Sequence, residues 1–172
     1  MGLDNLSKRL FGNQTVTSLD RVRVATQQGD FYSGCSLYGS IANDALAEIY
    51  LKLDGVHWHA SFEIHAGGDA RFNLFENPTI SSDGTPLNLY NNNRVTTKTT
   101  TGTAFSVPTV TNAGTVLINR FLPGGSGPKS GGGNLLFARE YILNGERTYL
   151  MRLTNVSGST QELSMHVLYY EQ

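Results

Sequence analysis

Apolar and polar residues alternate with a period of two along most of the chain. The alternation is clearest at residues 57–66, where an apolar set and a polar set interleave: Trp58, Ala60, Phe62 and Ile64 against His57, His59, Ser61, Glu63 and His65. A strand with one buried face has this period, because successive side chains point to opposite sides. The segment is therefore predicted to be a half-buried strand with its apolar set facing the core.

The same reading predicts further strands, about eight to ten in all. They are placed at residues 22–26, 31–33, 45–53, 70–75, 95–105, 116–121, 135–143, 148–153 and 162–170. A helix competes over 45–53, since Ala, Leu and Glu favour helices, but the alternation favours a strand. The Thr-rich segment 95–105 fits an exposed or edge strand. The core-facing sets of two strands are Ala47, Ile49, Leu51 and Leu53, and Leu163, Met165, Val167 and Tyr169.

Short turn signals separate these strands. Asp54-Gly55 predicts a hairpin between the strands at 45–53 and 57–66, and Asn144-Gly145 predicts another between those at 135–143 and 148–153. Residues 124–133 are so rich in glycine that a flexible loop is expected. With no internal repeat, these features indicate an all-β fold, an antiparallel β-sandwich resembling a jelly roll.

The first 20 residues have a different pattern. Leu3, Leu6, Leu10 and Phe11 follow one another at about helical spacing, behind a possible capping residue, Asp4. Two interpretations stay open: an arm that a partner orders, or a frayed terminus. The predicted organisation is thus an N-terminal arm at 1–20 and a single β-sandwich domain at 21–172.

Composition narrows the possible partners. The 172 residues fit one domain, only 16% are charged and the formal net charge is −1. That balance gives little electrostatic support for direct nucleic-acid binding. No apolar run approaches the roughly 18 residues of a membrane span, so no membrane partner is expected. Cys35 is the only cysteine, which excludes an intramolecular disulfide, and a buried, inert thiol is expected.

One constellation is suggestive of chemistry. The order of His57, His59 and Glu63, extended by His65, is similar to the first metal motif of cupins, a jelly-roll family. However, the only later histidine is His166, and the inward set of the strand is its apolar one. A polar solvent face is the favoured interpretation, with a divalent ion at an oligomer interface as the alternative. No nucleophile elbow, P-loop or dinucleotide fingerprint is found, so no enzyme and no cofactor are predicted.

Three segments resemble small virion proteins of tailed phages that decorate or cement the capsid: residues 78–87, 91–94 and 148–158. The resemblance implies a β-rich fold and assembly into trimers or other homo-oligomers. It also implies binding to the outside of a major-capsid-protein lattice. The spacing of Leu3, Leu6, Leu10 and Phe11 agrees with this, because it predicts an arm that would bind a partner. The expected location is the virion, after synthesis in the host cytoplasm, and no catalytic residues are implied.

Other functions compete with this one. A tail, baseplate or fibre-associated virion subunit would share the fold and composition. A carbohydrate-binding module is a third hypothesis, because the chain has eight Tyr and eight Phe, and exposed aromatic rings can stack on sugars. A cupin-like metalloenzyme is the fourth.

Overall fold

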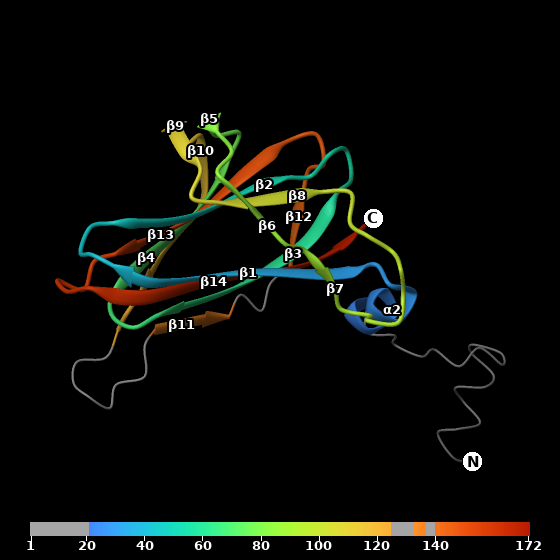
Figure 1. Cartoon of the computed structure of the whole chain (residues 1–172), viewed down its shortest axis with the longest axis horizontal. Coiled ribbons are helices and arrows are strands. Elements are labelled where there is room, and N and C mark those ends of the chain that lie inside the picture. The colour runs from blue at the N-terminus through green and yellow to red at the C-terminus, as the bar shows by residue number, and fades with distance from the viewer. Residues whose placement is uncertain (1–20, 125–132, 137–139) are drawn as a thin grey trace, which may run out of the picture.

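The computed structural model describes residues 21–124, 133–136 and 140–172. Strands make up 59% of the structure and helix 6%, and the strands form antiparallel sheets packed as a sandwich (Figure 1). The prediction of an all-β sandwich is therefore confirmed.

Two six-stranded sheets and a small ribbon contain all the described strands. Sheet A consists of β1 (Phe31–Ile41), β3 (Trp58–Ala66), β7 (Tyr90–Asn91), β11 (Gly133–Leu136), β12 (Tyr141–Leu143) and β14 (Gln161–Glu171). Sheet B consists of β2 (Leu46–Lys52), β4 (Ala70–Glu76), β6 (Thr85–Leu87), β8 (Thr103–Ser106), β10 (Thr115–Leu122) and β13 (Thr148–Asn155). The ribbon pairs β5 (Thr79–Ser82) with β9 (Thr109–Asn112).

The strand order is that of a jelly roll. Sheet A runs β11-β3-β14-β1-β7, with β12 also paired to β3, and sheet B runs β10-β4-β13-β2-β8-β6. Strands β1 to β4 alternate between the sheets, and so do β12, β13 and β14. The last strand thereby lies between β3 and β1, and β13 lies between β4 and β2. This winding is the double Greek key of jelly rolls.

The predicted inward faces form the core between the sheets. Fully buried side chains include Ile49 and Leu51 from sheet B, and Trp58, Phe62 and Tyr169 from sheet A. The indole of Trp58 stacks on the ring of Tyr169, with centroids 3.6 Å apart and an interplanar angle of 9°. Period-two alternation therefore identified the buried sides of β2, β3 and β14 correctly.

The two predicted hairpins are wrong. Residues 53–57 connect β2 in sheet B to β3 in sheet A, and residues 144–147 connect β12 in sheet A to β13 in sheet B. Both connections cross the sandwich because the apolar sides of the joined strands face each other over the core. The two turns also meet, since the amide N–H of Gly55 donates to the carbonyl of Gly145 at 2.9 Å.

The strand predicted at 22–26 is instead part of a helix, α2 (Arg21–Gln28). Gly29, with φ of 76°, ends it in a Schellman motif: its N–H donates to the Thr26 carbonyl, and the N–H of Asp30 donates to the Ala25 carbonyl. Ala25 packs against Phe31 and Tyr170 on the outer face of sheet A. Figure 1 places the helix at one end of the sandwich, near β7.

Other predicted strands are shorter than expected. Within residues 95–105 only the end is a strand, where β8 begins at Thr103. The strand predicted at 135–143 is divided into β11 and β12, which pair with different parts of β3. The short strands β5, β6, β7 and β9 were not predicted, because two to four residues are too few to show a period.

Candidate functional site

The structure does not bring the four candidate metal ligands together. His57 precedes β3, and its Nδ1 accepts a hydrogen bond of 2.9 Å from the amide of Gly145. Glu63 lies 3.3 Å from Nδ1 of His166 on the neighbouring strand β14. His65 lies further along the same face of β3. Across the described ranges, no group of three or more His, Cys, Asp or Glu side chains is placed to hold a metal ion.

His59 is buried, although it belongs to the set predicted to face solvent. Only 8% of the residue is exposed, because its ring stacks on that of Tyr170 with centroids 4.6 Å apart. Its Nδ1 contacts the Glu140 carboxylate and lies 3.0 Å from the Tyr170 hydroxyl, which itself donates to Glu140. His59 is thus part of a side-chain cluster on the outer face of sheet A.

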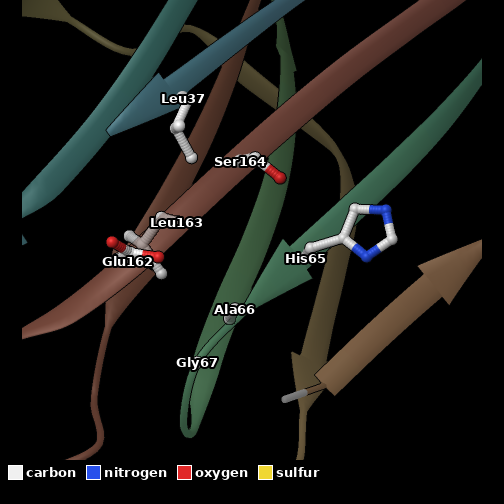
Figure 2. Close-up of a pocket in the computed structure, with 7 residues that line it drawn as sticks. All are labelled: Leu37, His65, Ala66, Gly67, Glu162, Leu163 and Ser164. Atoms are coloured by element: carbon white, nitrogen blue, oxygen red, sulfur yellow. The ribbon is translucent and has the colours of Figure 1, made fainter. Parts of the chain in front are cut away.

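A shallow cleft lies over the outer face of sheet A, near the turn that follows β3. It has a volume of about 250 Å³ and is lined by Leu37, His65, Ala66, Gly67, Glu162, Leu163 and Ser164. Figure 2 shows side chains of three strands there, and the register places Leu37, Ser164 and His65 in one row. Among the described residues, none forms a hydrogen bond with the His65 ring that would orient it as a base.

Cys35 is exposed, so the expectation of a buried thiol is wrong. It lies on the outer side of β1, directly opposite His166 of β14. The inward positions beside it are Gly34 and Tyr32, and the latter is 2% exposed. The strand was predicted for only three residues, too short a segment to assign a face to Cys35.

Strand β10 carries exposed apolar side chains at the edge of sheet B. Val116, Leu117 and Phe121 are 51%, 45% and 55% exposed, while Ile118 and Leu122 point into the core. Strand β4 pairs with one edge of β10, and within the described ranges no strand pairs with the other. An unpaired strand edge presents backbone N–H and C=O groups with which another chain can pair. The alternation at 116–121 predicted the strand but not its place in the sheet.

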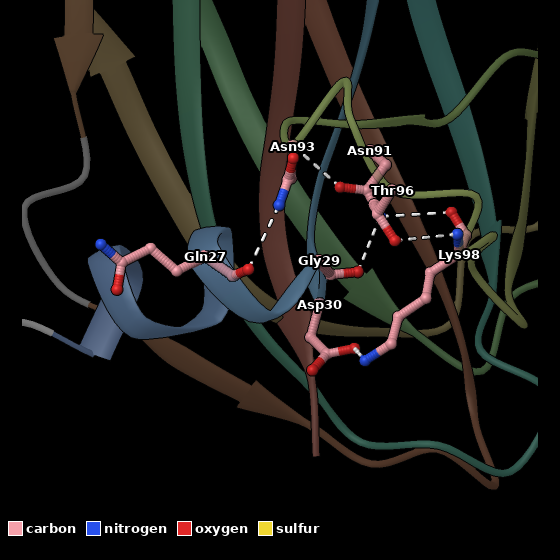
Figure 3. Close-up of polar contacts among 7 residues, drawn as sticks. All are labelled: Gln27, Gly29, Asp30, Asn91, Asn93, Thr96 and Lys98. Atoms are coloured by element: carbon pink, nitrogen blue, oxygen red, sulfur yellow. Dashed lines mark hydrogen bonds and ion pairs between the residues drawn. The ribbon is translucent and has the colours of Figure 1, made fainter.

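A long loop is fastened to α2 and the start of β1 (Figure 3). The side-chain amide of Asn91 donates to the carbonyls of Gly29 and Lys98, at 2.7 and 3.2 Å. The amide of Asn93 donates to the Gln27 carbonyl at 3.2 Å, and Lys98 forms an ion pair of 2.8 Å with Asp30. These contacts hold residues 88–99, which border a second cleft of about 250 Å³.

The pKa values of several tyrosine hydroxyls are raised, which favours their neutral form. Burial raises the pKa of the Tyr169 hydroxyl, which donates a hydrogen bond of 2.8 Å to Thr100. Burial also raises the pKa of Tyr32, Tyr38 and Tyr149. The pKa of Tyr170 is raised by burial and by its hydrogen bond to Glu140. These shifts follow from the positions of the rings in the sheets.

The predicted arm residues Leu3, Leu6, Leu10 and Phe11 lie outside the described residues. Of the helices that the structure describes, none is long and apolar enough to cross a membrane. Comparisons of the chain with protein-family models, with curated proteins and with solved structures find no match.

Proposed function

We propose that this protein is a virion structural protein that binds the outside of a major-capsid-protein lattice as a decoration or cement protein. The observation that supports this best is the apolar edge formed by Val116, Leu117 and Phe121 on β10. Apolar and aromatic groups with few charges are typical of the centre of protein interfaces. The exposed Arg120 in the same strand fits such an interface as well.

The fold suits such a role. A sandwich with two hydrogen-bonded sheets around one core is a stiff body, so little conformational freedom is lost when its edge binds another protein. Many copies on a symmetric lattice would add their individual contacts by avidity. We propose a symmetric homo-oligomer, specifically a trimer, as the unit that binds.

The role of β10 can be tested with Leu117→Lys and Phe121→Lys. Because both side chains are about half exposed, each change should alter the free energy of unfolding by no more than about 0.5 kcal/mol. If β10 is an interface, the variants should lose oligomer mass in light scattering or lose co-sedimentation with capsid shells. Val95→Lys is the matched control, since it changes an apolar residue that is 95% exposed outside the strands. Full retention of mass and co-sedimentation in both variants would reject β10 as the interface.

The site on the virion needs a separate experiment. Antibody labelling of purified virions in negative stain should place the protein over the capsid shell. Label confined to the tail, baseplate or fibres would favour the second virion role instead. A protein that is monomeric at high concentration and binds no virion component would reject the structural role altogether.

The arm at 1–20 is proposed to help fix the protein to its assembly. If its four apolar side chains become buried, each contributes about 1.5–3 kcal/mol. Deletion of residues 1–20 should then weaken co-sedimentation with capsid shells while leaving the sandwich folded. Unchanged oligomer mass and unchanged co-sedimentation would show that the arm has no such role.

A further inference from the structure

The cleft beside the loop at 88–99 has the features of a ligand site. Its lining includes the buried ring of Tyr32, the exposed ring of Tyr90 and the polar side chains of Asn93, Arg94, Thr97 and Thr99. Tyr90 is 53% exposed. The exposed ring of Tyr90 beside these polar groups is suited to sugars, whose C–H faces can stack on an aromatic ring while their hydroxyls bind polar groups.

The loop is held in place before any ligand binds. The side-chain amide of Asn91 donates to the carbonyls of Gly29 and Lys98, and its Oδ1 accepts a hydrogen bond of 2.8 Å from the N–H of Asn93. Tyr90 is fixed as well, because its hydroxyl accepts a hydrogen bond of 3.2 Å from the amide of Asn88. A cleft with a prearranged wall loses little entropy when a small ligand enters.

The cleft offers one positive charge to a ligand. Its two cationic residues are Arg94 and Lys98, and Lys98 is already paired with Asp30. The guanidinium of Arg94 lies 5.7 Å from the centre of the Tyr90 ring and forms no ion pair with any described residue. A guanidinium binds a carboxylate through two parallel hydrogen bonds. Thr97 and Thr99 line the same cleft, and both residues are exposed.

We infer that this cleft binds a carbohydrate carrying one carboxylate, such as a sialic or uronic acid. Arg94 would bind the carboxylate, Tyr90 would stack on the sugar ring, and the threonine hydroxyls would bind sugar hydroxyls. A nucleic acid fits less well, since its backbone presents many charges and the cleft has one unpaired cation. This inference does not rest on the proposed virion role, because it uses neither β10 nor the arm.

Saturation-transfer NMR with the full chain tests the site. The probes are 3′-sialyllactose, a glucuronic acid disaccharide and, as the neutral sugar, lactose. An acidic sugar should bind at millimolar concentration or better and more tightly than lactose. Tyr90→Ala should weaken its binding about tenfold or more, and Arg94→Gln should remove most of the preference for the acidic sugar. Val95→Ala is the control in the same loop and should bind like the unaltered protein.

Several results would overturn the inference. One is that neither acidic sugar binds. Another is binding that persists unchanged in both Tyr90→Ala and Arg94→Gln, which would place the sugar elsewhere. A third is an equal loss in the Val95→Ala control, which would indicate a general disturbance of the loop. Circular dichroism of each variant separates loss of the site from loss of the fold.

Discussion

At the scale of single residues, the surroundings of Trp58 show how tightly the core is packed. Its indole stacks on Tyr169 on one side, and Gly102 lies against its edge. A Cβ atom at position 102 would lie 2.1 Å from Cζ2 of Trp58 and 2.9 Å from the carbonyl oxygen of Lys52. Neither neighbour can easily move, because one is a fully buried ring and the other is backbone of β2. Only glycine therefore fits at this position without a clash.

This packing makes Gly102→Ala a sensitive test. We expect a loss of about 1–3 kcal/mol in the free energy of unfolding, since the added methyl overpacks the core. Urea denaturation followed by the fluorescence of Trp58 measures it. Gly39→Ala is the matched control, because a Cβ at position 39 meets no atom within 4 Å. Equal stability of the two variants would contradict the described packing.

The buried tyrosines predict sensitivity to alkali. Because burial raises the pKa of Tyr169 above 10.0, the unfolded chain loses this proton at a lower pH than the folded protein. The resulting stability is fully present below about pH 10 and declines as the pH rises beyond it.

A Tyr169→Phe variant isolates this contribution. It should lose about 1 kcal/mol at neutral pH with the hydrogen bond to Thr100, yet its stability should fall less between pH 9 and about 11 than that of the unaltered protein. Urea denaturation at a series of pH values provides the comparison. Parallel declines for the two proteins would show that Tyr169 does not contribute to the alkaline loss.

Individual residues also show where sequence reasoning reached its limit. The alternation in β3 placed Trp58, Phe62 and Ile64 correctly, because the period alone decides which side faces the core. The same pattern placed His59 in solvent, but the Tyr170 ring, more than 100 residues away along the chain, covers it. A contact of that kind leaves no trace in the local sequence.

At the scale of elements, α2 is the clearest case of a local pattern with two readings. Val22 and Val24 are β-branched and alternate with arginines, which favours a strand over five residues. The helix forms because Ala25 packs against Phe31 and Tyr170, and because Gly29 supplies the positive φ that ends it. A glycine after two glutamines was the available signal for a helix end.

The docking of α2 can be tested with Ala25→Asp. A carboxylate at this buried position cannot keep its water shell, so the helix should detach from sheet A. Amide exchange at Gly29 and Asp30 should then accelerate about tenfold or more, because their N–H groups belong to the helix-ending motif. The control is Gln27→Asp, with the same charge change at an exposed position of the helix. Equal exchange rates in the two variants would show that Ala25 does not anchor the helix.

The connections between strands were harder to predict than the strands themselves. A turn such as Asp54-Gly55 looks the same whether it joins neighbours in one sheet or crosses from one sheet to the other. What distinguishes the two is which strands become neighbours, and β2 pairs with β13 and β8 rather than with β3. The sandwich class could thus be predicted from the sequence, whereas the pairing of strands distant in the chain could not.

At the scale of the whole molecule, the winding makes the ends of the described chain depend on each other. Strand β1 pairs with β14 from Phe31 opposite Tyr170 onward, and β14 also pairs with the whole of β3. The last strand therefore lies in the interior of sheet A, and its Tyr169 contacts both Trp58 and Tyr32. Pairings between such distant segments are expected to make folding slow, on the order of milliseconds to seconds.

This dependence gives a final prediction about truncated chains. A chain that ends at residue 160 lacks β14, so β3 and β1 lose their common neighbour and the core loses Leu163, Met165, Val167 and Tyr169. We expect it to show no cooperative unfolding and no near-ultraviolet circular dichroism from a packed Trp58.

A chain that begins at residue 21 keeps every described strand and should unfold cooperatively within a few degrees of the full-length protein. Cooperative unfolding of the chain ending at 160 would contradict the central place of β14, and failure of the chain beginning at 21 would show that the first 20 residues belong to the fold. Because the two truncations remove 12 and 20 residues, a greater effect of the shorter deletion cannot come from size alone and would reflect the position of β14 between β3 and β1.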